Sequence, residues 1–246
     1  MNVGLIGAGV RGMHHASALS ESPGINFLAV CDLDFDRAKE AAEKYRVEAY
    51  GNVEEMLARK DLESVVIVTQ AKDHAELSIQ ALEAGKNVLC EKPLADSLEA
   101  AHRMLEAAES SGLKAAVGYQ RRFDPSFWTL KRIVRELDPL QVILTGQRGI
   151  FLEKYLRSGS AYGIMDAACH QVDLVNWLIG ISPRAVCGSV RSGVFTPTPA
   201  IDTVSIQIEY GDVDDKRTGS ILASMGGPGL KNFCHVVGKR GNAEIR

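Results

Sequence analysis

The sequence predicts an α/β protein with two domains, a doubly wound parallel sheet followed by a second α/β domain with antiparallel strands. Three observations favour this fold. Short aliphatic runs alternate with helical patterns over the first half of the chain, and a glycine-rich turn joins the first run to the first helix. Beyond about residue 120 this alternation of strand and helix patterns stops, and two helical patterns are followed by a series of strand patterns. We expect the boundary near Gln120, which gives domains of residues 1–120 and 121–246.

The first half contains strand candidates that are aliphatic throughout, which is typical of parallel strands covered on both faces. They are Val3–Ile6, Phe27–Cys31, Val65–Val68, Val88–Cys90 and Ala115–Gly118. The helix candidates are Met13–Ser20, Phe35–Tyr45, Val53–Ala58, His74–Ala84 and Leu98–Ser111. Asp96 is the expected N-cap of the last helix, because Glu99 then completes a capping box. Gly85 and Gly112 stand where helices end and φ turns positive.

The second half begins with two expected helices, Pro125–Glu136 and Gly163–Ile179, and continues as strands. The strand candidates are Ala185–Val190, Thr203–Glu209, Gly219–Met225, Phe233–Gly238 and Ala243–Arg246. The run Thr203–Glu209 alternates polar and apolar residues, which indicates an antiparallel strand with one buried face. Gly211–Lys216 is polar and predicts the tip of a hairpin.

Composition narrows the class of partner. Lys and Arg total 28 against 31 Asp and Glu, a net charge of −3, which argues against nucleic acid. The longest purely aliphatic stretch, Val65–Val68, is far too short to span a membrane. Five scattered cysteines without a Cys-x-x-Cys pair argue against disulfides and against a metal site. We therefore expect a cytoplasmic enzyme that acts on a small molecule.

The run Gly7-Ala8-Gly9-Val10-Arg11-Gly12 lies between the first expected strand and helix and predicts dinucleotide binding. Glycines there permit a tight turn, close approach of backbone to a pyrophosphate and close packing of helix on strand, and the helix N-terminus attracts the phosphates. Asp32 ends the second strand, where a carboxylate accepts the ribose hydroxyls of adenosine. Because Asp32 also repels a 2′-phosphate, we expect NAD rather than NADP.

Further candidates follow the carboxyl ends of later strands, where ligands bind in doubly wound sheets. Thr69, Gln70 and His74 follow the third strand candidate, and Glu91 and Lys92 follow the fourth. The Lys92 ammonium can stabilise negative charge on a substrate oxygen, or it is an ordinary solvated lysine.

The run from Gln120 follows the last strand candidate of the first half. Of Arg121 and Arg122, one is expected to meet substrate or cofactor and the other to pair with a carboxylate. The adjacent His14 and His15 cannot form a ligand pair on one helix face and are interpreted as structural or solvated.

Asp166, His170 and Asp173 stand at i, i+4 and i+7 of one helical pattern, within about 60° of one another. A histidine oriented by a carboxylate is a competent general acid and base. The alternative is the polar face of an amphipathic helix.

Taken together, the glycine motif, His74, the block Glu91-Lys92-Pro93, the run Gly118–Asp124 and the Asp166–His170–Asp173 spacing resemble the glucose–fructose oxidoreductase / inositol dehydrogenase (Gfo/Idh/MocA) family. The resemblance implies an N-terminal Rossmann domain and a C-terminal α/β domain with an open, mostly antiparallel sheet, often used to form homo-oligomers. It implies NAD(P)-dependent hydride transfer to or from a secondary alcohol of a sugar, inositol or related polyol.

The family also implies roles for particular residues. Lys92, Asp166 and His170 become the catalytic group, and Gln120, Arg121 and Asp173 become substrate-binding candidates. Thr69-Gln70 replaces the usual Thr-Pro. Family members are usually longer, so the C-terminal domain is expected to be incomplete. Two rival functions are an NAD-using glycosidase with transient oxidation and a non-catalytic regulator that binds a dinucleotide or sugar.

Overall fold

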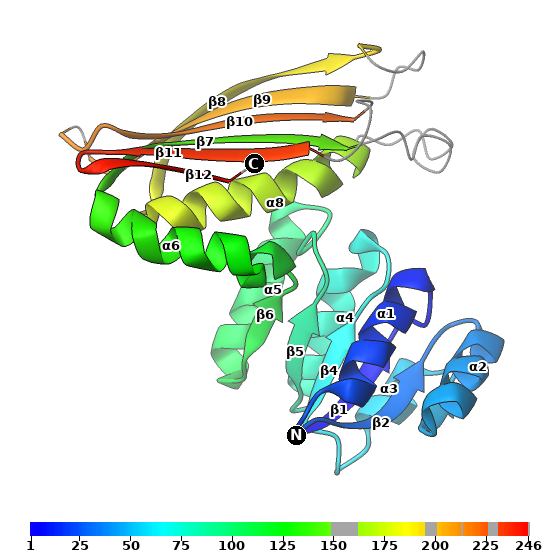
Figure 1. Ribbon diagram of the computed structural model, residues 1–246. Helices are drawn as coiled ribbons and strands as arrows, with labels where there is room; N and C mark the ends of the chain where they lie inside the picture. The colour runs from blue at the N-terminus through cyan, green and yellow to red at the C-terminus, as the bar shows by residue number, and fades with distance from the viewer. Residues whose placement is uncertain (149–161, 195–200, 213, 226–230, 246) are drawn as a thin grey trace. The chain divides into compact units, whose positions relative to one another are not determined.

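The computed structural model describes residues 1–148, 162–194, 201–212, 214–225 and 231–245 (Figure 1). The chain divides into two compact units, Met1–Gly118 and Tyr119–Arg246. Each unit has its own sheet and its own hydrophobic core. Within the described residues no helix is both long and apolar enough to cross a membrane.

The first unit is built on a six-stranded sheet in the order β3-β2-β1-β4-β5-β6, with every neighbouring pair parallel. The strands are β1 (Asn2–Ile6), β2 (Asn26–Cys31), β3 (Glu48–Tyr50), β4 (Ser64–Ile67), β5 (Asn87–Cys90) and β6 (Ala115–Val117). Strand order reverses direction between β1 and β4, which is the switch point of a doubly wound sheet. The predicted parallel fold is confirmed, and β3 is a strand that the sequence analysis did not foresee.

Helices connect these strands and cover both faces of the sheet. They are α1 (Val10–Glu21), α2 (Phe35–Tyr45), α3 (Val53–Leu57), α4 (Ala71–Glu83) and α5 (Leu98–Ser111). Neighbouring residues of one strand enter different cores: Leu5 lies in one buried cluster and Ile6 in another. Burial on both faces explains why these strands are aliphatic throughout.

The C-termini of α4 and α5 and the N-terminus of α5 test two local predictions. The N-cap is Ser97, whose side chain accepts a hydrogen bond from the Ala100 N–H, so the expected cap at Asp96 is wrong by one residue. Gly85 and Gly112 have φ of +78° and +65°, as their positions after helices predicted.

The second unit is a six-stranded sheet in the order β12-β11-β7-β10-β9-β8. Its strands are β7 (Pro139–Arg148), β8 (Pro183–Ser192), β9 (Ile201–Tyr210), β10 (Arg217–Met225), β11 (Lys231–Gly238) and β12 (Gly241–Ile245). Neighbouring strands are antiparallel except for β10 and β7, which are parallel. The expected mostly antiparallel sheet is confirmed. The sequence analysis missed β7, although it lies inside the sheet.

Two helices, α6 (Pro125–Leu137) and α8 (Tyr162–Ile179), lie on the same face of this sheet (Figure 1). Their apolar sides form its core with the strands. A Cβ added at Gly219 of β10 would lie 2.4 Å from Cγ1 of Val175, so α8 sits directly on the strand. Lys131 of α6 donates hydrogen bonds to the backbone carbonyl oxygens of Trp177 and Leu178. Two carbonyl groups in the last turn of α8, which have no partner within the helix, are thereby hydrogen-bonded.

Candidate functional site

The turn between β1 and α1 needs glycine at two positions. Gly7 has a φ of +100°, and a Cβ there would lie 2.3 Å from the Val68 carbonyl oxygen. A Cβ at Gly12 would lie 2.0 Å from the carbonyl oxygen of Gly7, so α1 packs against the turn that precedes it. These contacts hold α1 in place with its N-terminus at the carboxyl end of β1.

Gly9 is different, because a Cβ built there meets no atom of the described structure within 4 Å. It is the N-cap residue of α1 and has no side chain with which to cap the helix. The first N–H groups of a helix have no partner within it, and the helix dipole adds partial positive charge. Val10 and Arg11 in this first turn are exposed. An open cradle with N–H donors at a helix N-terminus fits a dinucleotide pyrophosphate.

Asp32 follows β2 and is fixed by two backbone donors. Its Oδ2 accepts a hydrogen bond from the Ala8 N–H at 2.7 Å, and its Oδ1 accepts one from the Asp34 N–H at 2.9 Å. The carboxylate is therefore held against the glycine turn. Each oxygen keeps a second lone pair that can accept from a ribose hydroxyl. Leu33 beside it is 94% exposed and carries no charge.

His74 joins the loops that follow β4 and β5. Its Nδ1 lies 2.7 Å from the Pro93 carbonyl oxygen, and its Nε2 lies 3.3 Å from the Thr69 carbonyl oxygen. His74 is 1% exposed, so it joins the loops after β4 and β5 from inside the protein. Thr69 Oγ1 is buried with no hydrogen-bond partner in the described part of the chain. Gln70 is the exposed residue that precedes α4.

Glu91 and Lys92 follow β5 and are both buried. Glu91 Oε1 lies 2.8 Å from His15 Nε2 and 3.9 Å from Arg11 Nε, and Oε2 accepts a hydrogen bond from the Lys92 N–H. Burial raises the pKa of Glu91, but the hydrogen bonds from His15 and the Lys92 N–H outweigh it and leave the pKa below its ordinary value. The Lys92–Pro93 peptide bond is cis. The Glu91 side chain therefore contacts α1, and contact with a cofactor stays a prediction.

In the second unit, Arg122 makes two hydrogen bonds to Asp173. Arg122 Nε lies 2.8 Å from Oδ2 and Nη2 lies 2.5 Å from Oδ1, and the hydrogen bonds raise the pKa of the guanidinium. The expected arginine–carboxylate pair is present, and Arg122 forms it. Gln120 and Arg121 precede it on the 3₁₀ turn η1 (Gln120–Phe123), where Gln120 is exposed. Substrate binding by Gln120 and Arg121 stays a prediction.

His170 lies on α8 one turn before Asp173 and is 1% exposed. The Tyr119 ring meets it edge to face, with centroids 6.2 Å apart. Burial, with smaller contributions from Cys169 and Asp173, raises the pKa of Tyr119 to about 12. Asp166 lies on the same helix, but its side chain is outside the described residues.

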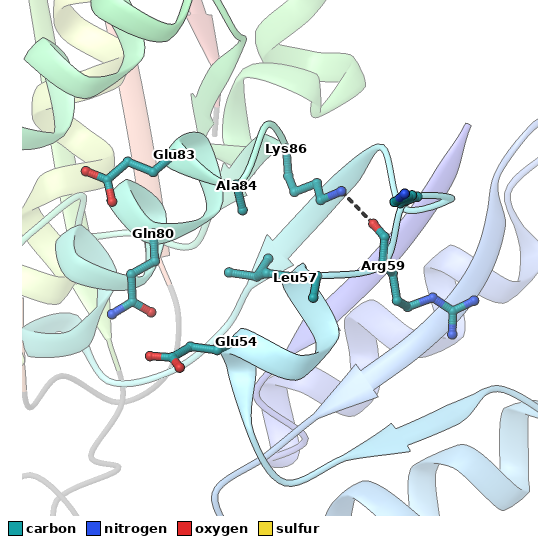
Figure 2. A pocket seen from close by; sticks show the side chains of 9 residues that line it. Glu54, Leu57, Arg59, Gln80, Glu83, Ala84 and Lys86 are labelled. Atoms are coloured by element: carbon teal, nitrogen blue, oxygen red, sulfur yellow. Dashed lines mark hydrogen bonds between the residues drawn. The ribbon is translucent and has the colours of Figure 1, made fainter.

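A hollow of about 500 Å³ in the first unit lies away from these residues (Figure 2). It is bordered by Arg59 and Lys86, which precede β4 and β5, and by Glu54 and Glu83. Lys86 Nζ donates to the Arg59 carbonyl oxygen at 2.7 Å, a bond drawn in Figure 2. The hollow is therefore at the amino ends of the strands, whereas ligands of doubly wound sheets bind at the carboxyl ends.

Comparison with protein families matches both units. Residues 1–119 match the model of an oxidoreductase family with an NAD-binding Rossmann fold. Residues 144–244 match the model of the GFO/IDH/MocA C-terminal domain.

Individual proteins show the same likeness. The inositol 2-dehydrogenase of Rubrobacter xylanophilus is 32% identical over 248 residues, which cover 99% of this chain and 70% of that protein. The inositol 2-dehydrogenase of Salmonella paratyphi B is 30% identical over 190 residues, which cover 76% of this chain. The match spans 56% of the length of that relative. The structure of GenD2 from gentamicin A biosynthesis in complex with NAD has a TM-score of 0.86 at 26% identity, over 100% of this chain and 72% of that one.

Proposed function

The chain belongs to the Gfo/Idh/MocA family of oxidoreductases and carries its NAD-binding Rossmann fold, and from this premise we propose that it is an NAD-dependent dehydrogenase of an inositol or a related polyol or sugar. The observation that carries the proposal is the open cradle at Gly9, which stands beside the anchored carboxylate of Asp32. The names of the relatives support the substrate class, because inositol dehydrogenases act on a ring of secondary alcohols.

The dinucleotide is held by backbone and by one carboxylate. Gly7 and Gly12 shape the turn, and the N–H groups of Gly9, Val10 and Arg11 face the pyrophosphate. Asp32 accepts the ribose hydroxyls. Thr69, Gln70, His74, Glu91 and Lys92 complete the proposed cofactor-binding set. His74 and Glu91 act indirectly, through the loops that they hold in place.

Bound NAD would supply the acceptor for the hydride that leaves the carbinol carbon of the substrate. His170 removes the hydroxyl proton, because an imidazole beside a carboxylate is a competent general base. Lys92 donates a hydrogen bond to the same oxygen and stabilises its developing negative charge. Asp166 orients His170 and supports the imidazolium that forms.

Substrate hydroxyls are recognised by Gln120, Arg121 and Asp173. Both oxygens of Asp173 already accept from Arg122, and the second lone pair of each can accept from a hydroxyl. We also propose that the chain works in the cytoplasm and that copies associate through the second sheet. The first proposal fits the cysteines, none of which forms a disulfide in the described part of the chain.

The test is a screen of inositols, hexoses, amino sugars and nucleotide sugars with NAD, read by absorbance of NADH. On the substrate found, Lys92→Met and His170→Ala should each lower turnover by about 10²-fold or more while leaving NAD affinity largely intact. Lys114→Met and His102→Ala are matched controls, because both residues are exposed.

Near-native turnover in either site variant would remove the role assigned to that residue. Sugar release without net NADH would instead favour the transient-oxidation glycosidase. Dinucleotide binding with neither reaction would favour a regulator.

A further inference from the structure

The segment from β5 to Lys92 is tied to α1 by a buried carboxylate that the sequence analysis did not connect to that helix. The Glu91 side chain is 9% exposed, and Oε1 lies between His15 at 2.8 Å and Arg11 at 3.9 Å. Arg11 and His15 are four residues apart on α1, so they stand on one face of the helix, one turn apart.

The main chain of Glu91 is fixed as firmly as its side chain. Its N–H donates to the Ile67 carbonyl oxygen at 2.9 Å, which extends the pairing of β5 with β4. Its Oε2 accepts from the N–H of Lys92, the next residue. A buried carboxylate must be paired to remain charged, and each of these bonds restricts where the chain leaves the sheet. The position of the Lys92 backbone therefore depends on α1.

We propose that Glu91, anchored by His15 and Arg11, is a positioning residue for Lys92. Through Glu91, two segments are held as one rigid unit. They are α1, whose N-terminus faces the pyrophosphate, and the loop that carries Lys92. The proposal rests on the proposed function for the role of Lys92. Small displacements of a group that touches the reacting atoms lower catalysis steeply, so the link should act on turnover.

A link that only supported α1 would have a different consequence. The glycine turn and the helix N-terminus would then shift, and any ligand with an adenosine and a pyrophosphate would bind less tightly. ADP-ribose has both groups and lacks the nicotinamide ring. Comparing ADP-ribose with NADH therefore separates the two roles.

The experiment uses the full chain with His15→Asn and Glu91→Gln. His14→Asn is the matched control, because His14 is the neighbouring histidine on α1 and is exposed. Lys92→Met sets the reference signal. Three measurements are made. The first gives the dissociation constants of ADP-ribose and NADH. The second is the fluorescence emission of bound NADH, which reports the surroundings of the dihydronicotinamide ring, and the third is kcat against KM for NAD.

We expect both variants to move the emission of bound NADH towards that of Lys92→Met, with ADP-ribose affinity within about twofold of the parent chain. We expect kcat to fall about tenfold, the effect of roughly 1.4 kcal/mol on the barrier, with little change in KM for NAD. His14→Asn should change none of these. Glu91→Gln keeps the size of the side chain and one oxygen acceptor, so it remains informative where His15→Asn does not fold.

Equal losses of ADP-ribose and NADH affinity would overturn the proposal in favour of simple support for α1. Unchanged emission and unchanged kcat would overturn it as well. A parent chain that binds NADH but oxidises no polyol would refute the proposed function, and the emission comparison would still decide the role of Glu91.

Discussion

Asp32 holds the glycine turn through the Ala8 N–H and the start of α2 through the Asp34 N–H. This fixed negative charge stands where a 2′-phosphate would lie, and the neighbouring Leu33 offers no cation. We expect NAD to bind more tightly than NADP by about 10- to 150-fold, the effect of removing or opposing one charge-assisted hydrogen bond. Isothermal titration of both dinucleotides measures the ratio, and Asp32→Asn should reduce it. Equal or tighter binding of NADP would refute this role of Asp32.

Glu91 makes a prediction about acid stability. Its pKa is lower in the fold than its ordinary value, so its bonds stabilise the protein above that value, and the stabilisation is lost as pH falls through the lowered pKa. Glu91→Gln should therefore be less stable than the parent chain near neutral pH, and the difference should shrink in acid. Urea unfolding at several pH values between about 7 and 3.5 measures it. A difference that grows on acidification contradicts the assigned sign.

The partners of these side chains were harder to predict than their positions. The spacing placed Asp32, Glu91 and Asp173 correctly after strands or on a helix, because motif and periodicity are local. It did not show that His15 meets Glu91, because the two are 76 residues apart and come together only in the folded chain. Adjacent residues of a helix point to different sides. This argument excluded His14 and His15 as a ligand pair, but it did not reveal that His15 contacts Glu91.

At the scale of the element, substitutions at Gly9 and Gly12 of the glycine turn should affect different properties. We expect Gly12→Ala to affect the stability of the fold and Gly9→Ala to affect NAD binding. Gly12→Ala places a Cβ 2.0 Å from the Gly7 carbonyl oxygen, so α1 must move, and we expect a loss of about 1–3 kcal/mol in the free energy of unfolding. Gly9→Ala meets no described atom, and φ there is −69°, so stability should change by less than about 0.5 kcal/mol.

The new Cβ of Gly9→Ala instead enters the cradle, and we expect NAD to bind at least about tenfold more weakly. Thermal unfolding and NAD titration of the two variants give the comparison. Tight NAD binding by Gly9→Ala would show that the pyrophosphate does not approach this backbone.

The strands that the sequence analysis missed share a physical cause. β3 has only three residues and lies at the edge of its sheet, so it carries little apolar signal. β7 buries Val142 and Leu144 on one face and leaves Gln141, Ile143 and Thr145 half-buried on the other, so polar and apolar residues do not alternate regularly along it. The cap at Ser97 rather than Asp96 reflects the same limit, since both residues are good caps and the choice depends on where the helix starts to pack.

At the scale of the whole molecule, the buried clusters of the first unit contain only residues of that unit. All the proposed adenosine and pyrophosphate contacts also lie within it. A fragment of residues 1–118 should therefore unfold cooperatively and bind NAD within about tenfold of the full chain. Circular dichroism and titration test this. A fragment that is unfolded, or folded without affinity for NAD, would show that the second unit contributes to the dinucleotide site.

The second sheet ends in an edge strand whose apolar residues are uncovered. Val186 and Val190 of β8 pair with Ile208 and Val204 of β9, and opposed residues of antiparallel strands share a face. Ile208 and Val204 are buried, whereas Val186 is 70% and Val190 is 50% exposed, so the helices on this face do not cover its edge. An exposed edge strand with an apolar side favours association between chains.

We therefore expect the chain to associate in solution, and the double variant Val186→Lys/Val190→Lys to shift it towards the monomer without loss of stability, because the replaced side chains are largely exposed. Ser189→Lys is the control, since Ser189 lies on the same strand and points to the other face of the sheet. Size-exclusion chromatography with light scattering measures the mass of each species. A monodisperse monomer of the parent chain would mean that this edge does not drive self-association. An equal effect of Ser189→Lys would instead indicate that the chains associate through the opposite face of the sheet, where side chains such as Leu222 are exposed.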